Sequence, residues 1–449
     1  MIKIKILLFA FLIFIPSIFI ANCAKKELEK RRYLLERVGD FQVLQVYADG
    51  FEELSLSEKM LAYYLSMASL AGRDIEYDQN HKYELEIRKI LEGIITHPEG
   101  IDKGIFTKIE KYTKLFWMNN GHYNYITSQK FVPEFTFDEF LGAAKKALEN
   151  EADLGLKSGE TIDEKLEKLK RTIFDINFEP VKTNKTPPPG EDIITGSANN
   201  LYDGVTLKEV VRYKEKYPLN SRLAKINGKI VEEVYRAGTD GIPPGRYAEK
   251  LKNVIEYLEL AVPYAGEKQQ ETLKHLINYF KTGDPQDFRK YNISWVKDDP
   301  NVDTILGFIE VYLDARGVKG EFEGLVSYVD KKETAVMERL AENAQYFEDK
   351  APWDEKYKKK WDEIPVANAI NVVMEVGGCG PISPAGINLP NPQDIRETYG
   401  SKSVSLNNII SARRAVVYPE FLKEFVFYEE DRKLIEKYRN LYRNAFIAL

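Results

Sequence analysis

The sequence predicts an α+β fold in which layers of helices surround a modest β core. Helical spacing of apolar residues covers most of the N-terminal third, and two later stretches are apolar and compatible with strands. Hydrophobic residues make up 44% of the 449 residues and aromatic residues 12%, which is enough for a large packed core. A chain of this length typically holds two or three domains.

Several segments of the N-terminal third have apolar residues three and four positions apart, which predicts amphipathic helices. The first is expected to begin at Ser57, as its cap, and to end at Gly72. The others are expected at 83–95, 104–118, 137–148 and 162–174.

A Pro-rich connector over 179–192 separates these helices from a mixed part of the chain. Asn227-Gly228, between two strand-like stretches, predicts a β-hairpin. Strands are expected at 304–313 and 322–329, and helices at 247–261, 270–280, 334–347 and from Glu429 onward. The charge-dense stretch 25–37 is typical of a tether or of a solvated helix.

The first 23 residues resemble a secretory signal. Two lysines precede an apolar run, from Ile6 to Ile20, that is short for a membrane span. Ile20-Ala21-Asn22-Cys23 then resembles a bacterial lipoprotein box, in which Cys23 is acylated. The alternative is simple cleavage near Ala21. We therefore expect export, either to the periplasm or as an outer-membrane-anchored lipoprotein, with membrane contact only through this signal or lipid.

Composition and motif searches exclude several other classes. The net charge of −6 is mild and neither half has a long basic run, so no nucleic-acid partner is expected. There is no Walker loop, GxSxG elbow or GxGxxG after a strand, and the four histidines form no HExxH or other close ligand pair. Cys379 has no His beside it, so a small residue in a tight Gly-rich bend is favoured over a nucleophile.

Two acids and a phenol stand beside apolar residues in the stretch 307–326. In a strand, Glu310 and Tyr312 would share one face, because successive side chains alternate. Glu323 follows Phe322 in the next strand-like stretch. Such a group could bind an ammonium group or a cation, whereas composition alone favours an exposed strand face with ordinary charges.

The stretch 377–394, GGCGPISPAGINLPNPQD, is rich in Gly and Pro and contains no Lys, Arg or Glu. It suits neither a helix nor an ordinary solvated loop, and it predicts a rigid, extended ribbon. Four other stretches accompany it: HYNYITSQKFVPEF (122–135), NISWVKD (292–298), the Glu310 segment and EED (429–431). Together with the ribbon and its continuation to 408, they resemble the dipeptidyl peptidase III family of zinc metallopeptidases. The similarity runs in order from about Glu53 to the C-terminus.

The resemblance implies two lobes around a wide cleft, with a β-barrel-like core in the lower lobe and only fragments of the helical upper lobe. The implied domains are a signal or lipobox (1–23), a tether (24–52), the lower lobe (53–330), an upper-lobe fragment (331–367), a return to the lower-lobe core (368–412) and a second upper-lobe fragment (413–449).

In this family, substrate peptides lie along an edge strand of the core and pair with it through their main chain. The resemblance assigns this role to the ribbon. Pro384 and Pro390 would stiffen it, and Ala385 and Gly386 would lie where another backbone approaches closely.

The resemblance also implies how the substrate's N-terminus is held. Asn388 and Asn391 match asparagines that hold this end of the peptide. Glu310, Tyr312 and Glu323 match residues around its ammonium group, which would select short peptides with a free N-terminus.

Zinc is the cofactor that the resemblance implies, bound through an HExxGH motif whose glutamate activates water. The motif is expected to begin where the sequence ends, at Leu449. We therefore expect a truncated member with no catalytic residues, no bound zinc and no peptidase activity of its own, derived from an exported enzyme that removes N-terminal dipeptides. The alternative is a non-catalytic, exported peptide-binding lipoprotein.

Overall fold

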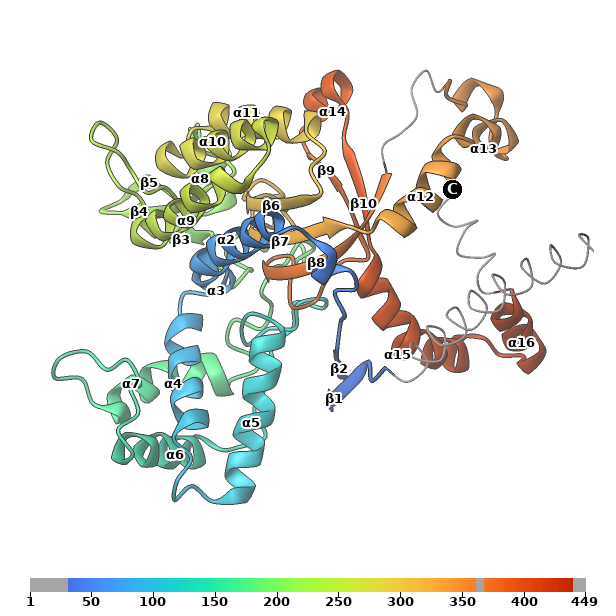
Figure 1. Ribbon diagram of the computed structural model, residues 1–449. Helices are drawn as coiled ribbons and strands as arrows, with labels where there is room; N and C mark the ends of the chain where they lie inside the picture. Colours follow the sequence, from blue (N-terminus) through green and yellow to red (C-terminus); the bar gives the residue numbers. More distant parts are fainter. Residues whose placement is uncertain (1–30, 361–366, 439–449) are drawn as a thin grey trace, which may run out of the picture. The chain divides into compact units, whose positions relative to one another are not determined.

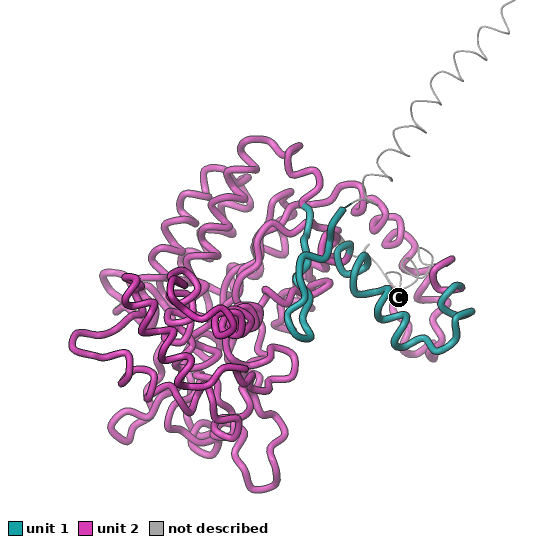
Figure 2. The backbone as a smooth tube through the Cα atoms, turned by 90° about the horizontal axis from the view of Figure 1, so that it is seen from below, with its two compact units in different colours: residues 1–47, 411–433 teal, residues 48–410, 434–449 magenta. Residues whose placement is uncertain are grey.

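The computed structural model describes residues 31–360 and 367–438 (Figure 1). The chain divides into two compact units, one of residues 1–47 and 411–433 and the other of residues 48–410 and 434–449 (Figure 2). The predicted signal and Cys23 lie outside the described residues. Within the described ranges, no helix combines the length and the apolar character needed to cross a membrane.

The smaller unit contains a hairpin and part of a long helix. β1 (Leu34–Val38) and β2 (Phe41–Leu44) pair antiparallel, so the described end of the predicted tether or helix is a strand. Helix α15 (Asn407–Phe425) contributes Glu420, which forms an ion pair with Arg37 and accepts a hydrogen bond from Gln42 Nε2 at 2.7 Å.

The larger unit is built on an open five-stranded sheet in the order β6-β7-β8-β10-β9. Its strands are β6 (Val302–Phe308), β7 (Phe322–Val329), β8 (Ala367–Gly377), β9 (Gly386–Leu389) and β10 (Lys402–Leu406). All neighbours are antiparallel except β8 and β10, which are parallel. Because the described strands β6 and β9 each pair on one side only, the sheet is not a closed barrel, and the predicted barrel-like core is not confirmed.

Helix α2 (Leu56–Gly72) packs against this sheet. A capping box between Ser55 and Glu58 starts the helix, so the cap is Ser55 and not the predicted Ser57. Its last residue, Gly72, meets β7 closely: a Cβ there would lie 2.1 Å from Phe322 Cζ. Strand β7 is buried along almost its whole length, which accounts for its apolar sequence.

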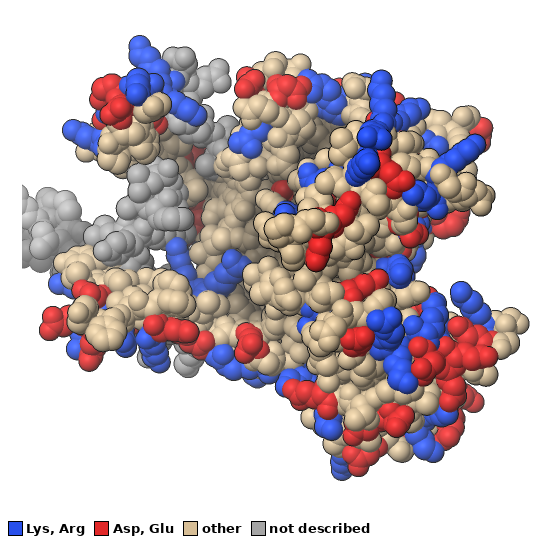
Figure 3. Space-filling view, turned by 180° about the vertical axis from the view of Figure 1, so that it is seen from behind, with Lys and Arg blue, Asp and Glu red and all other residues tan. Residues whose placement is uncertain are grey.

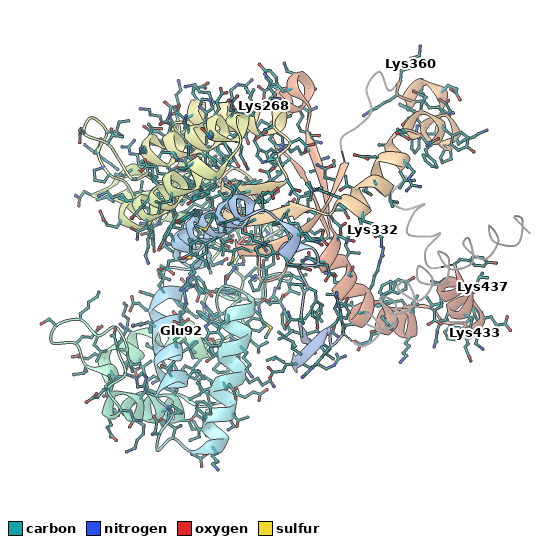
Figure 4. All side chains as sticks on the ribbon, viewed as in Figure 1. Glu92, Lys268, Lys332, Lys360, Lys433 and Lys437 are labelled. Atoms are coloured by element: carbon teal, nitrogen blue, oxygen red, sulfur yellow. The ribbon has the colours of Figure 1, made fainter. Side chains whose placement is uncertain are left out.

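A group of helices forms a separate hydrophobic core in the larger unit (Figure 1). It comprises α3 (Asp74–Asn80), α4 (Glu84–Thr96), α5 (Lys103–Met118), α6 (Phe137–Glu149) and α7 (Ile162–Phe174). The predictions for the last four are confirmed to within a residue or two. Glu92, labelled on α4 in Figure 4, accepts from Arg88 Nε at 2.7 Å and from Trp117 Nε1 at 3.1 Å, and so ties α4 to α5.

The predicted hairpin is confirmed. β4 (Ser221–Ile226) and β5 (Lys229–Val234) flank Asn227 and Gly228, whose φ angles of 50° and 76° are those of a type I′ turn. β3 (Tyr202–Asp203) completes this second sheet. The helices of this region are α8 (Leu207–Val210), α9 (Ala248–Ala261), α10 (Glu267–Thr282) and α11 (Pro285–Lys297), of which α9 and α10 were predicted.

The remaining helices come from the C-terminal part of the chain. The helix predicted over 334–347 is two helices, α12 (Lys331–Ala341) and α13 (Ala344–Lys350); α14 (Gln393–Tyr399) and α16 (Glu429–Lys437) follow. Three 3₁₀ turns are η1 (Phe51–Glu53), η2 (Val262–Tyr264) and η3 (Glu355–Tyr357). On the face drawn in Figure 3, basic and acidic side chains are interspersed rather than separated by sign.

Candidate functional site

The site begins where β6 ends. Strand β6 stops at Phe308, so Glu310 and Tyr312 lie in the connection after it and not in the predicted strand over 304–313. Main-chain hydrogen bonds nevertheless extend the pairing: Ile309 N donates to Glu321 O at 3.1 Å, and Glu321 N to Glu310 O at 2.6 Å. The backbone that carries Glu310 is thereby held against the segment that precedes β7.

Asn391 comes to Glu310 from the other edge strand. It lies two residues after the end of β9, and its Nδ2 donates to Glu310 Oε2 at 3.3 Å and to Ile309 O at 3.5 Å. Tyr312, which is 66% exposed, interacts with the same carboxylate. Partial burial raises the pKa of Glu310 above its usual value, while the contacts with Asn391 and Tyr312 oppose that rise.

Glu323 is a buried acid that interacts electrostatically with Glu310. It is 3% exposed in β7, opposite Gly307 of β6. Burial raises its pKa well above the ordinary range, and the nearby carboxylates of Glu310 and Glu321 add to the rise. Of the three residues predicted to surround an ammonium group, the structure therefore places Glu310 and Tyr312 together, with Glu323 close enough to act electrostatically.

A cavity of about 520 Å³ opens beside Glu310. One wall is a face of α11, a helix that was not predicted to take part although its NISWVKD stretch contributed to the resemblance. Its lining residues recur at helical spacing: Phe288, Tyr291, Asn292 and Trp295. Asn292 Nδ2 is buried with no hydrogen-bond partner, so the cavity contains a donor for a ligand.

The ribbon supplies both the opposite wall and a free edge. Leu389, Pro390 and Asn391 line the cavity, and among the described strands β9 pairs only with β10, which leaves its other edge unpaired there. The prediction that the ribbon contains an edge strand is confirmed. The extended part is shorter than predicted, because residues 393–399 form helix α14.

The other predicted ribbon residues are engaged with β10. Ala385 O accepts from Leu406 N at 3.0 Å, and a Cβ on Gly386 would lie 3.0 Å from Val404 O. Asn388 Nδ2 donates to Ser403 Oγ at 2.6 Å. The close backbone at Gly386 is thus that of the neighbouring strand, and half-buried Pro384 precedes the pairing.

Cys379 lies in the turn after β8 and is 4% exposed. Burial raises the pKa of its thiol well above the usual value, and the neighbouring Glu323 and Glu375 raise it further. A thiol in this environment is a poor nucleophile, which supports the interpretation of a small residue in a tight bend.

Known proteins of similar fold are dipeptidyl peptidases. The chain superposes on dipeptidyl peptidase III from Caldithrix abyssi with a TM-score of 0.60 and 18% identity, covering 86% of this chain and 61% of that one. For the enzyme from Corallococcus sp. strain EGB the TM-score is 0.60, with 18% identity and coverage of 87% and 61%.

Sequence relatives named dipeptidyl peptidase 3 include a slime-mould protein and a human protein. The protein from Dictyostelium discoideum is 28% identical over 417 residues, and the human protein is 28% identical over 424 residues. These matches cover 87% and 86% of this chain but 57% and 56% of the relatives, so the chain spans about half their length. Residues 220–449 match peptidase family M49. The chain belongs to peptidase family M49.

Family M49 is zinc-dependent. The HExxGH motif that the resemblance implies does not occur in the 449 residues. Among the described residues, one group of potential metal ligands lies close together, formed by His81, Glu84 and His122. Its members come from two separate segments and do not fit the family motif, so no catalytic step is assigned to them.

Proposed function

We propose that this chain binds the N-terminal part of short peptides, with the peptide main chain along the free edge of β9 and its ammonium group at Glu310. The observation that carries this proposal is the contact between Asn391 and Glu310 beside the cavity. It places an acid and an amide at the end of an unpaired strand edge, where a bound peptide would begin.

The strand edge supplies binding that is independent of peptide sequence. An extended peptide that adds to a sheet edge satisfies its own N–H and C=O groups with those of the strand, and these groups are common to all peptides. Gly386 and Asn388 of β9 are exposed, so a peptide can reach this edge.

The place where Glu310 and Asn391 meet, here called the Glu310 corner, selects peptides with a free N-terminus. An ammonium group is a donor only, and the Glu310 carboxylate and the side-chain oxygen of Asn391 are acceptors. The apolar cavity beside them accommodates a hydrophobic side chain near the N-terminus, and Asn292 Nδ2 offers a donor to a peptide carbonyl.

Membership of family M49 and relatives named dipeptidyl peptidase 3 support removal of N-terminal dipeptides as the parent activity. For the 449 residues alone we expect binding without hydrolysis, because the sequence contains no HExxGH motif. A dipeptidyl-naphthylamide assay with added zinc tests this expectation, and turnover by the purified chain would contradict it.

The N-terminal pattern supports a further part of the proposal, namely that the protein is exported and acylated at Cys23. Metabolic labelling with a palmitate analogue should mark the wild-type protein and not Cys23→Ala. Unlabelled wild-type protein in the exported fraction would favour cleavage near Ala21.

Calorimetric titration with a tetrapeptide and its N-acetylated form tests the proposed site. Losing a charge-assisted hydrogen bond costs about 1.5–3 kcal/mol, so acetylation should weaken binding roughly ten- to a hundredfold. Equal affinities, or no binding of either peptide, would contradict the proposal.

A further inference from the structure

A second group of chemically active side chains lies outside the Glu310 site. One ring nitrogen of His81, one of His122 and one carboxylate oxygen of Glu84 all lie within 4.8 Å of one another. All three side chains are completely buried. Two imidazoles and a carboxylate are a ligand set typical of zinc sites.

Several polar atoms of His122 and Glu84 lack hydrogen-bond partners among the described residues. Within residues 31–360 and 367–438, neither ring nitrogen of His122 has a hydrogen-bond partner, nor has Glu84 Oε2. Glu84 Oε1 lies 2.8 Å from His122 Nδ1, but the geometry is not that of a hydrogen bond; this oxygen accepts from the His122 backbone N at 3.2 Å instead. Unpaired polar atoms in a protein interior are costly unless something else binds them.

His81 is oriented by a carboxylate, as zinc-binding histidines commonly are. Its Nε2 lies 3.0 Å from Glu179 Oε2, and because a carboxylate only accepts, Nε2 carries the proton. The other nitrogen, Nδ1, accepts only a long hydrogen bond of 3.3 Å from Tyr83 N, which a metal ion would replace.

We propose that His81, Glu84 and His122 form a structural binding site for a zinc ion, with Glu179 orienting His81 from behind. This site uses none of the residues of the Glu310 corner and none of the HExxGH motif of the family. It supplies the partners that His122 and Glu84 otherwise lack.

The charges and dimensions suit such an ion. An unprotonated imidazole has a free lone pair on one ring nitrogen, which is the atom that binds a metal ion. In the bound state, the carboxylates of Glu84 and Glu179 would balance the charge of a divalent ion, and Glu179 Oε1 also lies 3.8 Å from Lys82 Nζ. Tetrahedral zinc with bonds of about 2.0–2.1 Å has ligand atoms about 3.4 Å apart, so binding would draw ligand atoms that lie within 4.8 Å of one another closer by at most about 1.4 Å.

The ammonium groups of two neighbouring lysines do not occupy the space between the three proposed ligands. Lys182 Nζ donates to Asn80 Oδ1 at 2.8 Å, and Lys130 Nζ donates to the carbonyl oxygens of Asp175 and Phe178. Both ammonium groups are therefore held by other partners.

The site would join separate parts of the larger unit. His81 and Glu84 lie at the start of α4, while His122 follows α5. The segment around His122 also holds the turn that leads to the ribbon: Asn120 Nδ2 donates to Gly377 O at 3.0 Å, and Tyr125 OH to Gly378 O at 2.7 Å. Zinc at His122 would thus stabilise both the helical core and the start of the ribbon.

Calorimetric titration of the chelator-treated full chain with zinc chloride tests the proposal. We expect one ion per chain, a rise in melting temperature on zinc addition and, with Co²⁺, a visible absorption band from the bound ion. His122→Gln should abolish all three effects. Glu179→Gln should weaken zinc binding roughly ten- to a hundredfold while leaving the stoichiometry at one, as loss of a ligand-orienting carboxylate does.

His275→Gln is the matched control, because His275 also lies near a glutamate, with Nε2 3.7 Å from Glu271 Oε1, but on the surface of α10. It should bind zinc like the wild type. If His122→Gln does not fold, Glu179→Gln and the cobalt spectrum of the wild type decide the question. Absence of zinc binding by folded wild-type chain, or equal binding by the wild type and Glu179→Gln, would overturn the proposal.

Discussion

The side-chain amide of Asn391 donates to the carboxylate of Glu310 across 3.3 Å, and this contact joins the ends of the two edge strands of the sheet. Asn391 follows β9 and Glu310 follows β6. Ile305 of β6 and Leu389 of β9 line the same cavity. The two edges therefore approach each other at this corner without pairing, and the space between them is the proposed peptide site.

Glu310→Gln tests the charge at this corner. The amide keeps the shape of the side chain but loses the anion, so affinity for a free N-terminus should fall roughly ten- to a hundredfold. Affinity for the acetylated peptide should not change. Calorimetric titration measures both, with Glu249→Gln, an 84% exposed residue of α9, as the matched control. Equal losses for both peptides would indicate a general disturbance of the site.

Peptide affinity should depend on pH in a way that follows the raised pKa of Glu310. A raised carboxyl pKa means that the anion forms only above the usual value of about 4.3, so affinity should increase as the pH rises through the elevated pKa. It should decrease again above about pH 8, where the peptide α-amino group loses its proton. Calorimetric titrations over this pH range measure the dependence of affinity on pH. In Glu310→Gln, the fall in affinity at acidic pH should be absent.

Glu323 should release a proton when a peptide binds. Burial raises its pKa well above the ordinary range, which favours the protonated side chain in the free protein. An ammonium group nearby favours the anion and lowers that pKa. Binding enthalpies measured in buffers of different ionisation enthalpy report the released proton. The release should be smaller for Glu323→Gln and for acetylated peptides, with the remainder coming from Glu310, and an unchanged release in Glu323→Gln would assign the proton to another group.

Local sequence signals predicted most of the regular structure. Capped helices such as α6 and α7 begin with Thr136 and Thr161, each paired with a glutamate three positions later, and their apolar residues face one core. The hairpin at Asn227-Gly228 follows from the need for positive φ at both turn positions. These features depend on neighbours in sequence, and so they can be predicted without the fold.

Features that depend on distant contacts were predicted less well. The end of β6 at Phe308 and the unpaired edges depend on how the sheet curves, which no local pattern encodes. The grouping of His81, Glu84 and His122 has no recognisable spacing, because the third residue reaches the first two only through the packing of α4 against α5. The start of α11 did have a signal, Asp284 before Pro285, typical of a helix N-terminus.

Pairing of the peptide main chain with β9 predicts sensitivity to N-methylation. Replacing one peptide N–H by N–CH₃ removes a donor and adds bulk at the strand edge. If that N–H pairs with β9, affinity should fall by at least the worth of one hydrogen bond, about 0.5–1.5 kcal/mol or roughly two- to tenfold. Competition titrations with a series of tetrapeptides methylated at one amide each should show losses at alternate positions, because alternate residues face the strand. Equal affinities across the series would contradict pairing with the edge.

Asp314 should control the connection that carries Glu310. Its buried carboxylate accepts from the backbone N of Arg316 at 3.0 Å, of Val318 at 2.9 Å and of Lys319 at 2.8 Å. Asp314→Ala leaves these donors without their acceptor, so the free energy of unfolding should fall by about 3 kcal/mol or more in urea denaturation.

The control for this variant is Asp354→Ala, whose side chain is 75% exposed and which should change stability by less than about 0.5 kcal/mol. In the part of the Asp314→Ala population that remains folded, peptide affinity should also fall, because the mobile connection no longer fixes the Glu310 carboxylate beside Asn391. Loss of stability with unchanged peptide affinity would show that Glu310 is positioned by its contact with Asn391 alone.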